Sequence, residues 1–252
     1  MTDKQINNPV AFITGASVRI GAAITRRLHL QGYNLILHYR NSAEMANQLA
    51  DEFNTNRPDS ALLVKGHLDI KADLSRIIQE VSSPTNLFQG RLDVLVNNAS
   101  AFYPTPMASA TAEQWDELLN TNLRAPFLLA QGLATQLASQ HGSIINITDI
   151  HGSKPLLNHS IYSLTKAGLI SLTKSLAQEL APDVRTNAVS PGAILWPERE
   201  KDDIEFHNKV LQQVPLKRLG DVDNIADTVW FLISNDYING QVIAVDGGRS
   251  IS

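Results

Sequence analysis

Tyr162 and Lys166, with Asp149 thirteen residues before the tyrosine, are the residues of this sequence best suited to acid–base chemistry. A tyrosine and a lysine four residues apart on a helix lie on one face, one turn apart. A neighbouring ammonium group favours the phenolate and lowers the tyrosine pKa from its ordinary value of about 10. Such a phenol can exchange a proton near neutral pH. Because this spacing is common by chance and also suits a surface pair, the surrounding elements must decide its meaning.

Short apolar runs alternate with helical patterns along the chain. They predict strands at residues 10–14, 35–39, 61–66, 92–97, 143–148, 184–189 and 241–245. The intervening patterns predict helices, including one from a capping box at Thr111 to about residue 138. Strict alternation predicts an α/β fold: a single Rossmann-like domain over residues 1–252, with a doubly wound parallel sheet of about seven strands and helices on both faces. Residues 194–215 interrupt the alternation, and we expect them to form a lid.

Composition limits the classes of function. Apolar residues make up 43% of the 252 residues, which is typical of a globular protein, and a net charge of −4 gives no reason to expect a nucleic-acid partner. The sequence has no cysteine, so thiol catalysis, disulfides and thiolate metal sites are excluded. The apolar runs are too short to span a membrane, and the first eight residues do not resemble a signal peptide. We therefore expect a cytoplasmic protein without a metal. Four histidines are interpreted as surface or structural residues: His29, His141, His151 and His159.

Gly15 opens a turn between the first strand and the first helix. Backbone in such a turn can approach a phosphate, and the helix N-terminus adds a favourable dipole. The usual pattern has three glycines, but Arg19 takes the place of the middle one, so a purely structural turn remains an alternative. Arg19 could itself form bidentate bonds to a phosphate. Asn97, Asp149 and Ser190 also follow strands, and the carboxyl ends of parallel strands form the ligand-binding edge.

The end of the second strand indicates the type of dinucleotide. A carboxylate here usually bonds the ribose hydroxyl of NAD(H), whereas a basic residue suits the 2′-phosphate of NADP(H). Residues 36–43 contain no acid and include Arg40. The sequence therefore favours NADPH, with a solvated loop residue as the alternative reading of Arg40.

Four motifs in the right order and spacing resemble the short-chain dehydrogenase/reductase family: Thr14-Gly15 with Gly21, Asn97-Asn98-Ala99, Tyr162 with Lys166, and Ser190-Pro191-Gly192. The resemblance covers nearly the whole chain. It implies that Asn122 holds a water in a proton relay behind Lys166, and that the protein is a homotetramer built through the helices near Thr111 and Ser160 and the last strand. It leaves open whether His67 or Asp69 lies against the adenine. The predicted cofactor site comprises Gly15, Arg19, Ile20, Gly21, Tyr39, Arg40, Asn41, Ser42, Asn97, Ala99, Ser100, Tyr162, Lys166, Pro191 and Gly192.

Asp149 stands where the family normally has a serine. A serine hydroxyl donates a hydrogen bond to a substrate carbonyl, whereas an ionised carboxylate only accepts and repels a developing alkoxide. The carboxylate would also raise the tyrosine pKa, against the effect of Lys166. Asp149 therefore suits a substrate rich in N–H groups or protonated on a ring nitrogen. A helix cap or a salt bridge is the alternative role.

Three stretches look like the pteridine reductases within this family: residues 14–21 with Arg19, residues 97–106, and residues 37–39 with Ser42. This resemblance implies that Ser100 bonds the cofactor or the pterin, that Phe102 stacks on the pterin, and that Arg19 reaches both. Trp196 either closes the pocket or is an ordinary packing residue. The predicted substrate site comprises Arg19, Ser100, Phe102, Asp149, Tyr162 and Trp196, and the predicted catalytic residues are Asp149, Tyr162, Lys166 and Asn122.

We hypothesise an NADPH-dependent pteridine reductase that converts a dihydropterin, of the dihydrobiopterin or dihydromonapterin type, to the tetrahydropterin, with dihydrofolate as a side substrate. A reductase of carbonyls or 3-oxoacyl thioesters is the first alternative. A nucleotide-sensing protein without catalysis is the second, although such a sensor has no need of Tyr162, Lys166 and Asn122.

Overall fold

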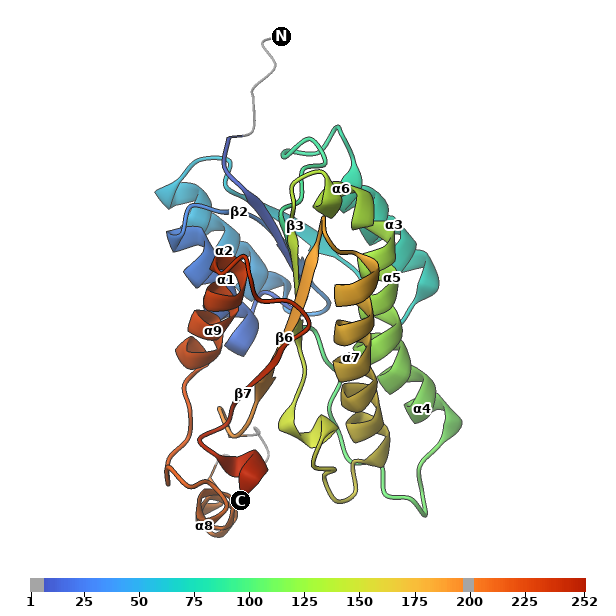
Figure 1. Cartoon of the computed structure of the whole chain (residues 1–252), viewed down its shortest axis with the longest axis vertical. Helices are drawn as coiled ribbons and strands as arrows, with labels where there is room; N and C mark the ends of the chain where they lie inside the picture. Colours follow the sequence, from blue (N-terminus) through green and yellow to red (C-terminus); the bar gives the residue numbers. More distant parts are fainter. Residues whose placement is uncertain (1–6, 197–201) are drawn as a thin grey trace.

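A computed structural model describes residues 7–196 and 202–252. Seven parallel strands form one sheet in the order β3-β2-β1-β4-β5-β6-β7 (Figure 1). Winding reverses between β1 and β4, which opens a crevice at the carboxyl ends of the strands. The predicted doubly wound sheet is therefore confirmed. The strands are β1 (Val10–Ile13), β2 (Asn34–Tyr39), β3 (Ala61–Lys65), β4 (Val94–Asn97), β5 (Ser143–Ile147), β6 (Arg185–Pro191) and β7 (Val242–Val245).

Helices cover both faces of the sheet (Figure 1). One face carries α1 (Arg19–Leu30), α2 (Ala43–Asn56) and α9 (Val222–Ser234), and the other carries α3 (Lys71–Ser82), α5 (Ala125–Gly132) and α7 (Ser160–Glu179). Side chains alternate along β1: Ala11 and Ile13 enter the core under the first three helices, whereas Val10 and Phe12 enter the core under the others. Burial on both faces explains why most of the strand sequences are rich in apolar residues.

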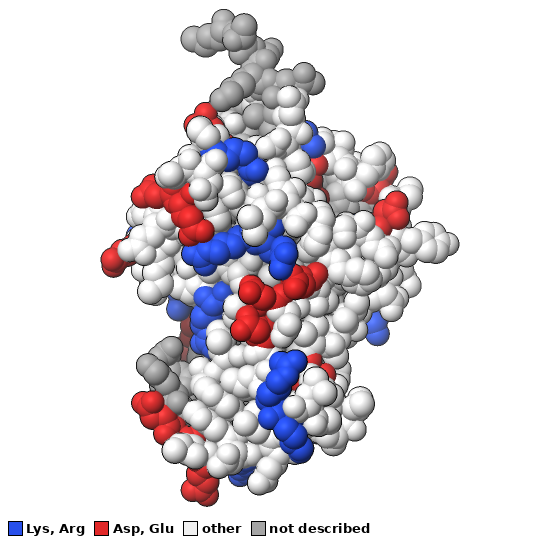
Figure 2. Space-filling view, turned by 90° about the vertical axis from the view of Figure 1, so that its left-hand side faces the viewer, with Lys and Arg blue, Asp and Glu red and all other residues white. Residues whose placement is uncertain are grey.

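The outer surface beside α1, α2 and α9 carries both signs of charge. Basic and acidic side chains alternate over this side of the molecule (Figure 2). Arg26 of α1 pairs with Glu52 of α2 at 2.8 Å, and Arg27 pairs with Asp227 of α9. These exposed pairs connect neighbouring helices and each contribute little stability.

The helix predicted from Thr111 to about residue 138 is present but interrupted. The capping box is confirmed, because Gln114 N donates to Thr111 Oγ1 (3.3 Å) and Thr111 N donates to Gln114 Oε1 (3.1 Å). After α4 (Ala112–Leu119), a π-helical turn, η1 (Asn120–Arg124), precedes α5, and α6 (Ala134–Ala138) follows a break at Leu133. Such π turns recur at functional sites. The apolar periodicity of the sequence did not reveal this one.

The segment predicted as a lid contains α8 (Ile204–Gln212), which Asp203 caps by accepting from Phe206 N at 2.9 Å. Residues 197–201 of the predicted lid lie outside the described residues. After β7 the chain ends in a 3-10 turn, η4 (Arg249–Ile251). Among the described residues, no helix combines the length and the apolar character needed to cross a membrane.

Candidate active site

A cavity of about 840 Å³ opens at the carboxyl ends of the strands. Its wall combines the turns after β1, β2, β3, β4 and β5 with the start of α7 and the lid segment. Most of the predicted site residues line it: Gly15, Arg19, Ile20, Gly21, Tyr39, Arg40, Asn41, Ser42, Ala99, Ser100, Phe102, Asp149, Tyr162, Lys166, Pro191, Gly192 and Trp196. The residues predicted from separate motifs are thus brought together in one cavity.

The turn after β1 has the close packing that a phosphate cradle requires. Gly15 adopts a positive φ of 61°, and a Cβ on Gly21 would lie 2.0 Å from the Gly15 carbonyl oxygen. Only glycine at position 21 therefore lets α1 approach the turn this closely. Asn98 fixes the turn by donating from Nδ2 to the carbonyl oxygens of Thr14 and Gly15, both at 2.9 Å. The cradle fits the phosphates of a dinucleotide.

His38 holds the ends of three strands together, a role that the sequence did not reveal. Its Nδ1 accepts from Gly15 N at 3.2 Å, and its Nε2 lies 3.1 Å from the Gly66 carbonyl oxygen. Since a carbonyl can only accept, the ring is neutral with its proton on Nε2. Burial lowers the pKa of His38 to about 4, which keeps the ring in this form at neutral pH.

Hydroxyl groups and a guanidinium lie at the end of β2. Ser17 Oγ and Ser42 Oγ are 2.6 Å apart, and Arg40 lines the same part of the cavity. Arg40 Nη1 lies 3.8 Å from Glu117 Oε1, and both side chains are exposed. The Ser17–Ser42 pair with Arg40 provides donors for a phosphate at this corner.

Asp69, rather than His67, lies in the cavity wall after β3. Leu68 and Asp69 line the cavity, whereas the backbone N–H of His67 donates to Asp73 Oδ2 at 2.7 Å. Asp69 is therefore the one of the two that faces the cavity, and contact of either residue with an adenine stays a prediction.

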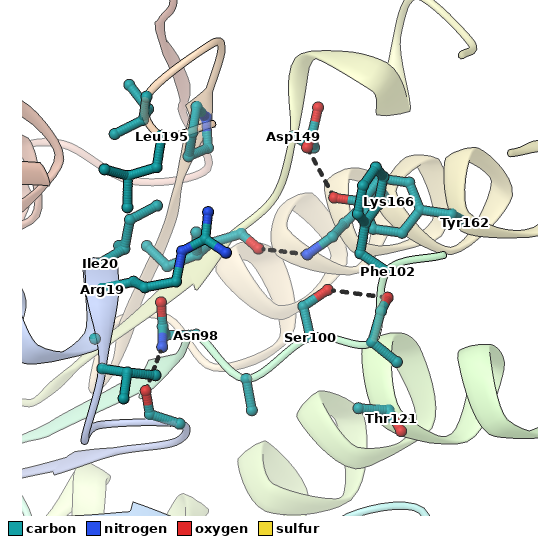
Figure 3. Close-up of a pocket in the computed structure, with 18 of the residues that line it drawn as sticks. Arg19, Ile20, Asn98, Ser100, Phe102, Thr121, Asp149, Tyr162, Lys166 and Leu195 are labelled. Atoms are coloured by element: carbon teal, nitrogen blue, oxygen red, sulfur yellow. Dashed lines mark hydrogen bonds between the residues drawn. The ribbon is translucent and has the colours of Figure 1, made fainter. Parts of the chain in front are cut away.

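Tyr162, Asp149 and Lys166 form the chemical centre of the cavity (Figure 3). The Tyr162 hydroxyl donates to Asp149 Oδ2 at 2.7 Å, and Lys166 Nζ donates to the Ile147 carbonyl oxygen at 3.0 Å. Lys166 Nζ lies 5.6 Å from the centre of the Tyr162 ring. Burial lowers the pKa of Lys166 to about 8, although the charge of Asp149 opposes this shift.

The expectation that Lys166 lowers the tyrosine pKa is wrong for this structure. Burial of the phenol and, next, the adjacent carboxylate of Asp149 raise the pKa of Tyr162 well above its ordinary value. A weaker effect from Ser100 opposes them. Tyr162 is therefore a protonated phenol that donates its hydrogen bond to the carboxylate of Asp149. The sequence predicted this raising effect of Asp149 on the tyrosine pKa.

Asp149 has both the capping role and the site role that the sequence left as alternatives. Its Oδ1 accepts from His151 N at 2.8 Å and caps the 3-10 turn η2 (Ile150–Gly152). Its Oδ2 remains for Tyr162. Since capping fixes the carboxylate at the end of β5, the orientation of Oδ2 is set before any ligand binds.

The side chains of Asn97 and Asn122 lie outside the cavity wall. Asn97 is buried and donates from Nδ2 to Asn146 Oδ1 at 2.9 Å, so it braces β4 against β5. The Asn122 amide bonds both the N–H and the carbonyl of Ala101 and also meets Ser100 and Thr165. All the hydrogen-bonding groups of its side-chain amide are in use. A water of the predicted proton relay could therefore bond only to the main chain of Asn122. Both are correctly predicted to lie near the site, but their side chains brace it.

Phe102 lies over the tyrosine and has one face already covered. Its ring stacks on His159 (centroids 4.8 Å apart, 13° between planes) and meets Tyr162 edge-on at 4.7 Å. The side chain is 45% exposed, so a flat substrate can still stack on the face that His159 leaves free.

The substrate end of the cavity contains residues that sequence reasoning missed. His151 and His159, interpreted as surface or structural, line the cavity. Trp196 also lines it while stacking on His207 at 3.8 Å and 10°, so it packs against a neighbour, and its closing of the pocket stays a prediction. Further residues of this wall are Leu156, Leu157, Ile194, Leu195, Phe206, Val210 and Arg249. They come from loops and the lid, where no periodic pattern marks the side that faces inward.

A parallel sheet with a glycine turn after its first strand and a tyrosine–lysine pair at its carboxyl edge is the arrangement of a nicotinamide-dinucleotide-dependent oxidoreductase. A family model described as enoyl-(acyl carrier protein) reductase matches residues 15–250. The chain belongs to the short-chain dehydrogenase/reductase family.

Curated relatives of similar identity differ in their named substrates. The chain is 38% identical to pteridine reductase 1 of Leishmania tarentolae, with 97% of each chain covered. It is 36% identical to the 3-oxoacyl-(acyl-carrier-protein) reductase FabG of Staphylococcus epidermidis, covering 96% of this chain and 98% of the relative. It is 35% identical to the granaticin polyketide synthase putative ketoacyl reductase 2 of Streptomyces violaceoruber, with 96% of each covered. Similarity alone therefore does not select a substrate.

Proposed function

We propose that this protein is an NADPH-dependent pteridine reductase that converts a dihydropterin to the tetrahydropterin. The observation that carries the proposal is the 2.7 Å hydrogen bond from the Tyr162 hydroxyl to Asp149 Oδ2. Asp149 accepts the hydrogen bond of the Tyr162 hydroxyl, and an ionised carboxylate has no hydrogen of its own to donate to a substrate carbonyl oxygen. The pair instead suits a ring with N–H donors and a nitrogen that must gain a proton.

The cavity supports the choice of cofactor. The close-packed turn at Gly15 and Gly21 accommodates the dinucleotide phosphates, and the Ser17–Ser42 pair with Arg40 offers hydroxyl and guanidinium donors to a 2′-phosphate. NADPH, when bound, supplies the hydride for reduction of the C=N bond. Lys166 binds the nicotinamide ribose in this proposal, because its ammonium is enclosed and directed by Ile147.

Tyr162 delivers the proton that reduction of a C=N bond requires. The high pKa of Tyr162, caused by burial and then by Asp149, keeps the phenol protonated until the ring nitrogen becomes basic. The O–H bond then breaks toward that nitrogen, and Asp149 passes a replacement proton from solvent to the phenolate oxygen. Placing a proton donor beside the reacting atom contributes about 10²–10⁴-fold to the rate.

Arg19, Ser100 and Phe102 position the ring. Arg19 extends from the turn after β1 into the cavity, with Ser100 and Phe102 on the wall that carries Tyr162 (Figure 3). Arg19 has a positive φ of 53°, a backbone strain that is found at functional sites. Residues 194–215 act as the lid in this proposal, and Trp196 forms part of its inner surface.

A 3-oxoacyl-thioester reductase is the second candidate, because relatives named for that activity are 36% identical over nearly the whole chain. It requires Asp149 to be protonated or unimportant. A cytoplasmic location and a homotetramer are further parts of our proposal that rest on the sequence.

The experiment measures NADPH oxidation with dihydrobiopterin, dihydromonapterin, dihydrofolate and an oxoacyl thioester, in the wild type and in Asp149→Ser. We expect turnover of the pterins, and a loss of about 10²-fold or more in kcat on the serine variant. Asp51→Ser, at an exposed position on α2, is the matched control and keeps full activity.

Three outcomes would contradict the proposal. Thioester turnover well above that of every pterin would favour the second candidate. Unchanged pterin turnover in Asp149→Ser would show that Asp149 has no part in the reaction. NADPH binding without turnover of any substrate would favour the nucleotide sensor.

A further inference from the structure

Arg249 is a cavity-lining cation outside the reaction centre described above. It belongs to η4, the last turn of the chain, and its side chain reaches the wall shared with Asp149 and the lid. The sequence motifs did not indicate a role for Arg249.

The turn that carries Arg249 is fixed on several sides. Asp246 accepts from Gly248 N (2.9 Å) and Ser250 N (2.7 Å). Ser252 Oγ donates to the Gln213 carbonyl oxygen at 2.7 Å, and Lys154 Nζ donates to the Ser252 carbonyl oxygen at 2.5 Å. The turn is thereby bound to the end of α8 and to the loop after β5, so the guanidinium is positioned in advance.

The guanidinium keeps most of its hydrogen-bonding capacity. Nη2 donates to Gln213 Oε1 at 3.1 Å, whereas Nε and Nη1 have no partner within the described ranges. Guanidinium offers five N–H donors in a planar fork that matches carboxylate and phosphate oxygens. Arg249 forms no ion pair with any described carboxylate, although Asp149 and Asp246 are near enough to raise its pKa against the lowering effect of burial.

The cavity wall around Arg249 has few acidic side chains that would repel an anion. Among the described wall residues the acids are Asp69 and Asp149. Asp69 follows β3 on the far side of the Gly15 turn, and Asp149 is already bonded by Tyr162 and His151. Asp149 and Asp246, the acids whose charge acts on Arg249, both accept hydrogen bonds from other groups and neither forms an ion pair with it.

We propose that Arg249 binds an anionic group on the tail of the substrate, a carboxylate or a phosphate, so that dihydropterins with charged tails are preferred over those with neutral tails. This inference rests on the proposed pteridine reductase function. Asp149 and Tyr162 act on the ring, and Arg249 acts on the tail.

The test compares kcat/KM for dihydrobiopterin, whose tail is neutral, with that for dihydrofolate, which has carboxylates, and for dihydroneopterin monophosphate. In Arg249→Met we expect kcat/KM for the anionic substrate that this site accepts to fall at least tenfold, mainly through a higher KM. We expect kcat/KM for dihydrobiopterin to change less than twofold. Arg249→Lys restores part of the loss. The anionic substrate whose kcat/KM falls more identifies the group that Arg249 binds, a carboxylate or a phosphate.

Arg218→Met is the matched control, since Arg218 is an exposed cation that bonds its neighbour Leu219 and does not line the cavity. We expect no change in it. Equal losses on neutral and anionic substrates in Arg249→Met, or no loss on either anionic substrate, would overturn the inference.

A binding measurement separates this inference from the proposed function. Folate, neopterin monophosphate and biopterin are titrated calorimetrically into the NADP⁺-bound protein, wild type and Arg249→Met. Weaker binding of either anionic ligand in the variant, with unchanged biopterin binding, supports the inference, whereas unchanged affinity for both anionic ligands, or no binding of either to the wild type, overturns it. Absence of pterin turnover, by contrast, refutes the proposed function whatever folate does.

Discussion

The burial of Lys166 predicts how NADPH affinity depends on pH. The side chain is 2% exposed, and burial lowers its pKa to about 8. The ammonium form is therefore dominant below pH 8 and is lost above it. Since the charged form is the one that attracts the dinucleotide, we expect NADPH affinity to weaken about tenfold for each pH unit above 8, until the affinity of the neutral form is reached. Fluorescence titration with NADPH between pH 6 and 10 measures this.

Lys166→Arg and Lys174→Met test the assignment of this pH dependence. A guanidinium stays charged throughout the range, so Lys166→Arg should bind NADPH with a flat profile above pH 8. Lys174 is exposed on the same helix, and its loss should leave the wild-type profile unchanged. A wild-type affinity that is flat to pH 10, or the same decline in Lys166→Arg, would assign the titration to another group.

The spacing of Tyr162 and Lys166 predicted that the two side chains lie in one site. It did not predict which electrostatic effect determines the tyrosine pKa. Tyr162 and Lys166 lie in one cavity as their spacing on a helix requires. The direction of the tyrosine pKa depends on burial and on the 2.7 Å contact with Asp149. The sequence identified the opposing effect of Asp149, but depth of burial is a property of the packed fold, and it decides the outcome.

His38 acts at the level of secondary-structure elements, because it connects the turn after β1 with the ends of β2 and β3. Its pKa falls from 6.5 in the unfolded chain to about 4 in the fold. The stabilisation is fully present above pH 6.5 and is lost as the pH falls toward 4, because the unfolded chain takes up the proton first. We expect this group to remove about 3 kcal/mol from the free energy of unfolding across that range. Urea unfolding at a series of pH values measures the loss.

His38→Asn isolates this contribution. Asparagine offers a short acceptor toward Gly15 but does not titrate, so the variant should be less stable at pH 7 and should lose less stability on acidification. His141→Asn is the control, because His141 is exposed and its positive φ of 48° suits asparagine. If wild type and His38→Asn lose stability in parallel between pH 6.5 and 4, protonation of His38 is not the cause.

The strands were predicted from the sequence, whereas the irregular π turn was not. The alternating pattern located every described strand to within a few residues, since strands buried on both faces are rich in apolar side chains. The π turn at Asn120–Arg124 was not predicted from the apolar pattern. It nevertheless matters, since it brings Thr121 into the cavity wall and Asn122 against Ala101.

At the scale of the whole molecule, topology explains why the cofactor end of the site was predictable and the substrate end was not. The carboxyl ends of parallel strands converge, so motifs after β1, β2, β4 and β5 had to meet. Arg249, His151 and Phe206 come from the last turn, a short 3-10 turn and the lid helix. Their approach depends on tertiary packing of segments with no periodic pattern, which the sequence does not specify locally.

The side of the molecule formed by α4, α5 and α7 has the character of an interface. These helices lie side by side (Figure 1), and each leaves a large apolar side chain exposed: Trp115 (44%), Phe127 (44%) and Leu164 (46%). Large apolar side chains that are exposed on neighbouring helices are typical of association surfaces. At the other end of the sheet, β7 is an edge strand, which is a second surface available for pairing.

We therefore expect a tetramer with two kinds of contact, of which Phe127→Lys breaks one. A charge buried in an apolar interface is costly, so the variant should become a dimer through the contact that remains. Light scattering should give half the wild-type mass at the same concentration. Leu30→Lys, on α1 and 77% exposed, is the control and should retain the full mass. A monomeric wild type, or a Phe127→Lys variant of unchanged mass, would show that these helices do not form the interface.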